Sequence, residues 1–349
     1  MPPFIKESIN DIIDDDIPDL EPVIDPTLDK QLQPSKEKYS IKIVWRNVIL
    51  MSALHIAAIY GAYLCFVSAK WQTNLAAFVL YQMGGLGITA GCHRLWAHKA
   101  YKARLPLRIL LAMFQTIAFQ NHIYEWSRDH RVHHKYSETD ADPHNSRRGF
   151  FFAHVGWLLV RKHPDVIRKG RQIGMDDLMR DPVVRVQRKY YLPLVLFFCF
   201  IMPTYVPYLF WNESLYNGFY ICALLRYAWT LNMTWLVNSA AHFWGRHPYD
   251  KEIMPAENYF TVYGALGEGF HNYHHTFPWD YAASELGWRF NVSTMFINAM
   301  HAIGLAYDLK QVSPEMIMKR KQRTGDVPLK GNYGLYHPST TKIDELKSE

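Results

Sequence analysis

Histidines are concentrated in two short segments of this chain. DHRVHHKY, residues 129–136, contains histidines at positions i, i+3 and i+4, and HNYHH, residues 271–275, repeats this spacing. An α-helix advances by about 100° per residue, so the three side chains of each segment would share one helical face. One such segment could be a solvated helix, but two copies indicate that imidazoles are gathered to bind metal. The six residues are His130, His133, His134, His271, His274 and His275.

Three further histidines lie beside apolar segments, His93 and His98 in HRLWAH and His242 in NSAAH. A single zinc ion takes about four ligands, so nine imidazoles predict two neighbouring metal centres. His93 and His98 lie about 140° apart on an ideal α-helix; they could serve two different ions, or one ion if the helix ends or bulges. Imidazole binds zinc, copper, iron and nickel, so the ligand type does not select the metal.

Other polar residues near these segments could assist the metal. Asn238 lies four residues before His242 on the same helical face and could reach a metal directly or through water. Five carboxylates could accept hydrogen bonds from imidazole N–H groups or could be surface charges; they are Glu125, Asp129, Glu138, Asp142 and Glu268. We expect packing or surface roles for the remaining histidines, which are His55, His122, His144, His154, His163, His247, His301 and His337.

The composition places these residues in an all-α membrane protein. The chain has 349 residues, of which 49% are hydrophobic and 20% are charged, and its net charge is +6. The mean hydropathy of -0.17 means that charge is segregated from the apolar segments. Four segments are long and apolar enough to cross a bilayer as helices; they are residues 47–69, 75–91, 191–210 and 218–241.

The expected membrane domain covers residues 39–325, with two cytosolic blocks at 92–190 and 242–325. Both blocks are rich in Lys and Arg, whereas the two short connections carry one lysine between them, so both termini should be cytosolic. The acidic segment 1–38 and the segment 326–349 are predicted to be disordered tails. Arg226 within the fourth span should face a partner, a cavity or the interface.

Two shorter patterns complete this topology. Residues 107–119 and 150–160 are apolar but too short to span, and could form interfacial helices or a cap over the spans. In GGLGITAG, Gly87 and Gly91 predict a helix-packing face of small residues. The four cysteines form no CxxC pair, which gives no support for a zinc finger or an iron–sulfur site.

The order of the histidine segments is specific. Together with FQN, DADPHNSRRGFFF, HVGWLLVRKHPD and GEGFHNYHHTFPWDY, it resembles the membrane acyl-CoA desaturases, insect type in particular. The resemblance covers about residues 40–325. It implies four transmembrane helices under a cytosolic helical cap that holds a di-iron centre, with a narrow, kinked acyl tunnel beneath that cap.

The resemblance also assigns roles to individual residues. It implies that the nine histidines are the iron ligands and that Asn238 approaches iron through water. It implies contacts with the coenzyme A moiety for Asn121, Arg128, Asp129, Arg161 and Lys162. It places Gln120, Trp126, Thr234 and Trp235 around the bend of the tunnel.

The implied activity is the introduction of a double bond into a long-chain fatty acyl-CoA, using O₂ and two iron ions. Electrons would come from cytochrome b5 and its NADH-dependent reductase. The implied location is the endoplasmic reticulum membrane, with several spans and both termini cytosolic, and no nucleic acid is expected as a partner. The double-bond position and its cis or trans geometry stay open.

Two alternatives stay open at this stage. A di-iron fatty acyl hydroxylase would use the same oxidant. A histidine-rich membrane protein that binds or transports metal would place ligands near the middle of the membrane, where only His55 lies.

Three positions carry further expectations. His122 replaces an acidic residue expected after FQN, which puts local coenzyme A contacts in doubt, and RTGD runs into VPLK, so the C-terminal docking could differ. Tyr81 would lie about 18 Å from His93 along a helix axis. Its ring could therefore close the far end of the tunnel, or it could face lipid or another helix.

Overall fold

A computed structural model describes residues 40–326, and most of these residues are helical. The tail predicted at 1–38 lies outside the described residues, as does the tail predicted at 326–349 apart from Asp326. The two short strands, β1 (Lys102–Ala103) and β2 (Ala306–Tyr307), pair antiparallel.

The α-helices differ greatly in length. They are α2 (Trp45–Val67), α3 (Trp71–Leu86), α4 (Leu105–Ala118), α5 (Ile123–Tyr136), α6 (Trp157–Leu159), α7 (Pro164–Arg171), α8 (Asp176–Arg180), α9 (Pro182–Lys189), α10 (Tyr191–Val195), α11 (Met202–Trp211), α12 (Leu215–Asn217), α13 (Arg226–Asn238), α14 (Ala240–Phe243), α15 (Tyr259–Gly264), α16 (His271–Thr276), α17 (Val292–Ala302) and α18 (Pro314–Thr324). Short 3₁₀ and π segments complete the list; they are η1 (Gly87–Ala97), η2 (Ser146–Arg148), η3 (Phe152–Gly156), η4 (Leu196–Ile201) and η5 (Gly218–Leu225).

Three helical stretches among the described residues are long and apolar enough to cross a membrane. They are Trp45–Val67, Trp71–Ala97 and Tyr191–Trp211. The second stretch begins at Trp71 and ends at Ala97, so the helix extends beyond the bounds of 75 and 91 predicted for the span. The reason is that the helix starts within KWQTN and continues as η1 through His93.

The fourth predicted span is also helical, but it is not among those three stretches. The elements α12, η5 and α13 follow one another from Leu215 to Asn238. Polar residues such as Arg226 and Asn232 lower the hydropathy of this stretch. The fourth span therefore stays a prediction.

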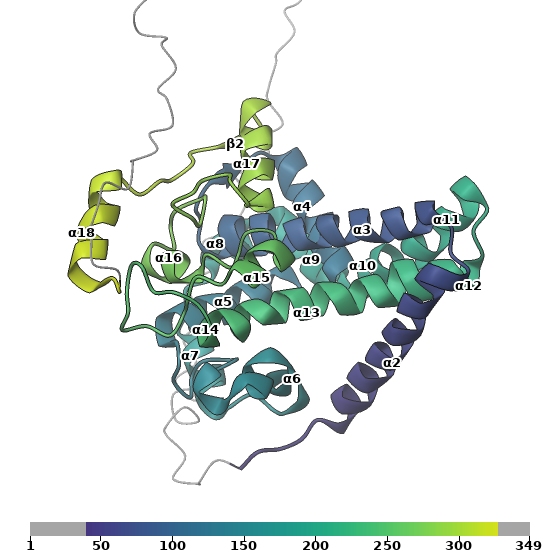
Figure 1. Ribbon diagram of the computed structural model, residues 1–349, viewed down its shortest axis with the longest axis horizontal. Coiled ribbons are helices and arrows are strands. Elements are labelled where there is room, and N and C mark those ends of the chain that lie inside the picture. Colours follow the sequence, from purple (N-terminus) through teal and green to yellow (C-terminus); the bar gives the residue numbers. More distant parts are fainter. Residues whose placement is uncertain (1–39, 327–349) are drawn as a thin grey trace, which may run out of the picture. The chain divides into compact units, whose positions relative to one another are not determined.

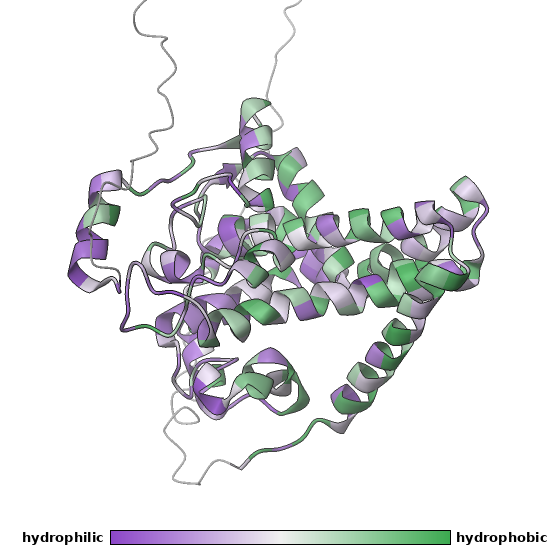
Figure 2. Ribbon diagram, in the orientation of Figure 1, coloured by the Kyte–Doolittle hydropathy of each residue, from purple (hydrophilic) through white to green (hydrophobic). Residues whose placement is uncertain are grey.

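The long helices and the short helices occupy different ends of the described fold (Figure 1). At one end α3, α11 and α13 run side by side. Helix α2 diverges from α13 towards the N-terminal end of α2. At the other end lie α5, α14 and α16, together with most of the loops. Figure 2 shows hydrophobic residues concentrated along the long helices, whereas much of α18 is hydrophilic. This segregation agrees with the low mean hydropathy of the whole chain.

Arg226 is buried in the interior of the helical bundle, at 1% exposure. Its guanidinium donates to the backbone carbonyls of Cys222, Ile117 and Cys199 at 2.7–3.0 Å. Carbonyl dipoles satisfy a cation that would be costly in an apolar interior. The expectation that Arg226 faces partners is thus confirmed, and its contacts tie η5 to α4 and η4.

Small residues permit a close approach between η1 and α4. A Cβ added at Gly87 would lie 2.1 Å from the backbone nitrogen of Gln115 and 2.3 Å from the carbonyl carbon of Phe114. Backbone atoms cannot yield as a flexible side chain can, so only glycine fits there. The predicted small-residue packing face is confirmed at Gly87, and it fixes the helix that carries His93.

We expect Gly87→Ala to destabilise the protein by about 1–3 kcal/mol, because the added methyl group forces η1 and α4 apart. Thermal unfolding of the detergent-solubilised protein measures the effect as a lower midpoint temperature. Gly174→Ala is the matched control, since a Cβ there meets nothing within 4 Å. Equal midpoints for the two variants would contradict the close packing.

Candidate metal centre

The nine predicted ligand histidines form two groups in the folded chain. In each group the ring nitrogens lie within 4.8 Å of one another. The first group contains His93, His98, His130, His134 and His274. The second group contains His133, His242, His271 and His275. The geometry therefore gives two neighbouring nitrogen-rich sites, as the number of histidines predicts.

The two HxxHH segments divide their histidines between the groups. On α5, His130 and His134 turn to the first group and His133 to the second. On α16, His274 turns to the first group and its neighbour His275 to the second. Because each helix contributes to both groups, α5 and α16 hold the groups next to each other.

A π-helical turn brings His93 and His98 into one group. The backbone N–H of His98 donates to the carbonyl of His93 at 3.0 Å, an i to i+5 bond that defines the π-helix. The wider turn places the two rings 5.0 Å apart between centroids. An ideal α-helix does not describe residues 87–97, and the observed geometry favours the alternative that the two histidines serve one ion.

Carboxylates orient three of the imidazoles through Nδ1. Glu268 lies 2.8 Å from His93 Nδ1 and Asp142 lies 3.0 Å from His133 Nδ1. Glu138 lies 3.1 Å from His242 Nδ1. Such contacts fix the tautomer that carries hydrogen on Nδ1 and leave the Nε2 lone pair free. The carboxylate contacts suggested for Glu138, Asp142 and Glu268 are therefore present.

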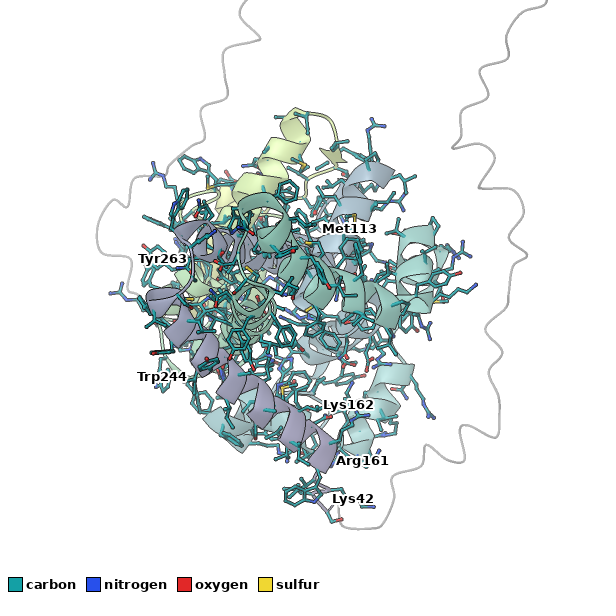
Figure 3. The ribbon with its side chains drawn as sticks, turned by 90° about the vertical axis from the view of Figure 1, so that its right-hand side faces the viewer. Lys42, Met113, Arg161, Lys162, Trp244 and Tyr263 are labelled. Atoms are coloured by element: carbon teal, nitrogen blue, oxygen red, sulfur yellow. The ribbon has the colours of Figure 1, made fainter. Side chains whose placement is uncertain are left out.

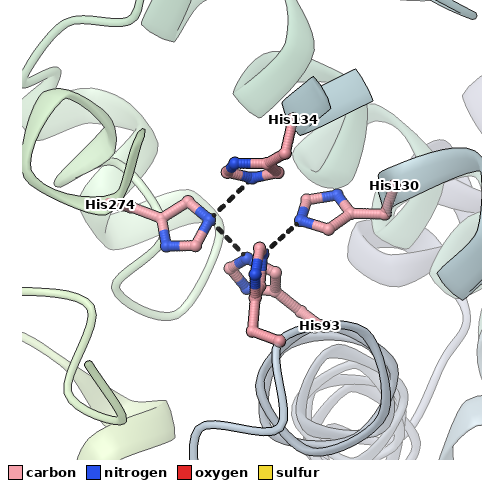
Figure 4. A group of neighbouring side chains, drawn as sticks. His93, His130, His134 and His274 are labelled. Atoms are coloured by element: carbon pink, nitrogen blue, oxygen red, sulfur yellow. Dashed lines mark hydrogen bonds between the residues drawn. The ribbon is translucent and has the colours of Figure 1, made fainter. Parts of the chain in front are cut away.

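The Nε2 atoms of different histidines face one another at short range. His93 Nε2 lies 2.8 Å from His274 Nε2, and His242 Nε2 lies 3.0 Å from His271 Nε2. Figure 4 shows the rings of the first group turned towards a common point. His93 and His242 each donate the Nδ1 hydrogen to a carboxylate. The lone pair on Nε2 of each therefore points at a neighbouring ring. A cation between the rings satisfies this arrangement.

Burial favours the neutral imidazole, which is the form that binds metal. Desolvation, aided by the charges of neighbouring histidines, lowers the pKa of six of these histidines well below its usual range. They are His98, His130, His134, His271, His274 and His275. Nitrogen donors of this kind, with carboxylates behind them, fit two transition-metal ions, iron among them.

Two cavities meet beside the first group. The larger one, of about 810 Å³, extends from α2 to Asn121 and Asp129, and Gln120 and Trp235 also line it. The smaller one continues past His93 towards Tyr81 and Gly264. Both are bordered by Trp126, His130, Thr234 and Asn238. At this junction the Gln120 side-chain amide donates to the Thr234 hydroxyl at 2.9 Å.

Tyr81 lies at the wall of the smaller cavity. Its side chain is 8% exposed, and its hydroxyl donates to the backbone carbonyl of Gly264. The alternative that Tyr81 faces lipid therefore does not hold. Its ring borders the cavity together with Gly85 and Met233.

Four of the five predicted coenzyme A residues are linked to one another near the N-terminal end of α2, and Asn121 lines the larger cavity with Asp129. Arg128 and Lys162 both pair with Asp129 and Glu125, at distances of 2.5–3.4 Å. Glu125 and Asp129 therefore contact these cations. The backbone N–H of Arg161 donates to the carbonyl of Lys42 at 2.9 Å. Figure 3 shows Lys42, Arg161 and Lys162 beside one end of the ribbon of α2.

The two departures from the expected motifs have local structural roles. His122 caps α5, since its Nδ1 accepts a hydrogen bond from the backbone N–H of Glu125 at 3.0 Å. In RTGD, Thr324 donates to the carbonyl of Tyr249 at 2.7 Å, and Asp326 accepts from the backbone N–H of His247 at 2.8 Å. The RTGD segment thus docks on residues 247–251.

Sequence reasoning missed several buried polar residues. Arg94, at 1% exposure, pairs with Glu268 at 2.9 Å, and its position between two ligand histidines was a usable signal. His144 is buried, and its ring centroid lies 4.3 Å from that of His133. His55 and His154, expected to have packing roles, both bond to Asn232. No spacing in the sequence could have linked His55, His154 and Asn232.

The comparisons with known proteins agree with this geometry. The family model for fatty acid desaturases matches residues 69–288. An acyl-CoA Delta-9 desaturase of Acheta domesticus is 62% identical over 292 residues, which cover 83% of this chain and 81% of the relative. Stearoyl-CoA desaturase 5 of Homo sapiens is 59% identical over 284 residues, which cover 81% of this chain and 86% of the relative. This chain belongs to the fatty acid desaturase family.

Proposed function

We propose that this enzyme introduces a double bond into a long-chain fatty acyl-CoA, using O₂ and electrons delivered by cytochrome b5. The observation that carries the proposal is the meeting of two apolar cavities beside two groups of buried and half-buried imidazoles. An acyl chain that occupies both cavities would pass the imidazoles at an internal carbon. Such a position fits oxidation within the chain and not at its end.

Two irons bound by the imidazoles would supply the oxidising power that an unactivated methylene pair requires. The reaction removes two hydrogens from adjacent carbons and, with two electrons and two protons, reduces O₂ to two waters. The protein's own residues would hold the metal ligands in place and orient the acyl chain. Glu268, Asp142 and Glu138 orient their imidazoles, and the apolar cavity walls exclude water. The Gln120–Thr234 pair borders the place where the chain would turn.

The carrier end would lie at the opening of the larger cavity near Asp129. Arg161, Lys162 and Arg128 would hold the phosphates of coenzyme A, with Asn121 and Asp129 contacting its polar groups. Basic side chains near an apolar opening suit a substrate with an anionic head and an apolar tail. Arg128 and Lys162 both pair with Asp129, which lines the larger cavity, so the two cations lie next to it.

The proposed topology has four membrane helices, with the fourth formed by α12, η5 and α13. Both termini and the helical cap would face the cytosol, where acyl-CoA and cytochrome b5 with its NADH-dependent reductase are present. The basic blocks on one side of the spans support this orientation in the endoplasmic reticulum membrane.

The two alternative functions, hydroxylation and metal transport, predict a different product or a different ligand position. A hydroxylase would use the same irons but return oxygen to the carbon, so its product would carry a hydroxyl group. A metal transporter would hold its ligands near the middle of the helices. Both histidine groups instead lie at the ends of helices or on short cap helices, with His93 four residues before the end of its helix.

Metal analysis of the purified protein should give about two irons per chain, because each imidazole group offers a complete set of nitrogen donors. The His133→Ala variant should lose iron and form no product. The amount of this variant in the membrane should equal that of the parent, because His133 lies on α5, outside the predicted spans. The His301→Ala variant, changed at an exposed position, should keep both its iron and its product formation. One zinc and no iron in the parent would contradict the assignment.

Replacing both Arg161 and Lys162 with alanine should weaken acyl-CoA binding about tenfold at low salt, because two cations near the phosphates are lost. The carboxylates of Asp129 and Glu125 would also lose their Lys162 partner and repel the phosphates. Titration of acyl-CoA at several salt concentrations measures the effect, and the difference from the parent should shrink with salt.

The matched control removes the same charge elsewhere, by alanine at the exposed residues Lys102 and Lys310. Binding by this control should equal that of the parent. An unchanged affinity of the Arg161 and Lys162 variant at low salt would exclude the proposed phosphate contact.

Tyr81→Ala should shift the products towards longer acyl chains, because removal of the ring opens the end of the smaller cavity. The double bond should keep its distance from the carboxyl end, because the coenzyme A contacts and the bend of the tunnel set that distance and the far end of the tunnel does not. Product analysis in yeast cells supplied with mixed saturated chains measures both properties. Tyr81→Phe should keep the parental profile, as should Phe78→Ala at an exposed position on the same helix.

An unchanged chain-length profile in an active Tyr81→Ala enzyme would show that Tyr81 does not close the cavity.

A further inference from the structure

Two histidines outside the imidazole groups belong to a continuous chain of hydrogen bonds between α2, α13 and η3. Ser239 Oγ lies 2.9 Å from His154 Nδ1, and His154 Nε2 lies 3.2 Å from Asn232 Oδ1. Asn232 Nδ2 lies 3.0 Å from His55 Nε2. The chain ends where His55 Nδ1 meets the backbone carbonyl of Met51 at 2.7 Å.

The donors and acceptors in this chain fit one neutral arrangement. Asn232 Nδ2 also donates to the carbonyl of Ala228 at 2.8 Å, which fixes the orientation of the amide. The amide oxygen then accepts from His154 Nε2, so that His154 Nδ1 accepts from the Ser239 hydroxyl, for which the carbonyl of Trp235 at 2.9 Å is a second acceptor. His55 Nε2 accepts from the amide, and its Nδ1 donates to Met51. Every ring nitrogen is satisfied without a charge, which suits an apolar setting.

Trp235 lies between the two histidines of this chain. Its ring stacks on His55 with centroids 6.2 Å apart and an interplanar angle of 23°. His154 meets the same ring edge-on, at 5.7 Å and 81°. Trp235 is 3% exposed and lines the larger cavity. The hydrogen-bonded imidazoles therefore fix the tilt of a side chain that forms the cavity wall.

Ser239 connects this chain to the imidazole groups. It lies at the break between α13 and α14, where its φ and ψ are -111° and -78°. Asn238 precedes the break, and His242 follows it on α14. The Ser239 hydroxyl is thus placed to fix the point at which the helix turns from the cavity wall to the second imidazole group. Figure 1 shows α13 leading into α14 at this point.

We propose that His55, Asn232, His154 and Ser239 are positioning residues that determine which carbons of the acyl chain lie beside the imidazole groups. The inference rests on the proposed desaturase function and extends it to the position of the double bond. Loss of one bond in the chain lets the Trp235 ring and the helix break shift relative to the imidazoles. The acyl chain then slides by one or more carbons, although the irons stay bound.

The test uses the full chain expressed in desaturase-deficient yeast, with double-bond positions mapped by mass spectrometry. In His154→Ala and Asn232→Leu the ratio of minor to major positional isomers should rise about fivefold, the factor that corresponds to the loss of one hydrogen bond. Ser239→Ala removes only a hydroxyl group and should shift the ratio in the same direction. Iron per chain should equal that of the parent.

Two control variants separate positioning from a general loss of stability. His154→Gln offers one acceptor and one donor, and should restore the parental isomer ratio. His301→Ala removes an exposed histidine that contacts the carbonyl of Ala306, and should leave the ratio unchanged.

The isomer ratio decides the inference. A parental ratio in His154→Ala, Asn232→Leu and Ser239→Ala enzymes with parental iron content would overturn it. If the larger replacements do not fold, the ratio in Ser239→Ala alone decides. If the parent chain forms no double bond at all, the proposed function fails instead, so the two failures are distinguishable.

Discussion

The convergence of imidazole lone pairs is the constraint on which the rest of this structure depends. Nine converging nitrogen lone pairs, on five buried and four half-buried histidines, repel one another unless a cation lies between them. The fold must therefore hold the rings against this repulsion before metal arrives. It does so with carboxylates behind His93, His133 and His242, and with two helices that each serve both groups. We therefore expect metal binding to stabilise the folded chain.

The position of the imidazole groups relative to the cavities gives the site its chemistry. Metal ions at the end of a closed pocket would oxidise the terminus of a substrate. Here the groups lie beside the junction of two cavities, so an acyl chain that filled both cavities would have an internal segment nearest to them. The half-buried hydrogen bond between Gln120 and Thr234 at the junction and the buried Trp235 at the wall would restrict how the chain can pass. On this proposal, selectivity for a position along the acyl chain follows from the shape of the cavity walls together with the coenzyme A contacts.

The sequence predicted the residues of the candidate site better than it predicted their supports. The HxxHH spacing is a local property of helices, so its consequences could be read directly from the order of residues. The π-turn after Gly87 could not, because it depends on how η1 packs against α4 around that glycine. The contacts between Glu268 and His93 and between Asn232 and His154 join residues far apart in the chain. Only the tertiary fold creates them, which is why His55 and His154 gave no signal.

The central claim is that two irons occupy the two imidazole groups beside the acyl cavities. Anomalous diffraction from crystals of the purified enzyme, measured on both sides of the iron absorption edge, tests it most directly. We expect two iron peaks, one among His93, His98, His130, His134 and His274 and the other among His133, His242, His271 and His275. A single peak, or peaks that appear at the zinc edge and not at the iron edge, would contradict the account.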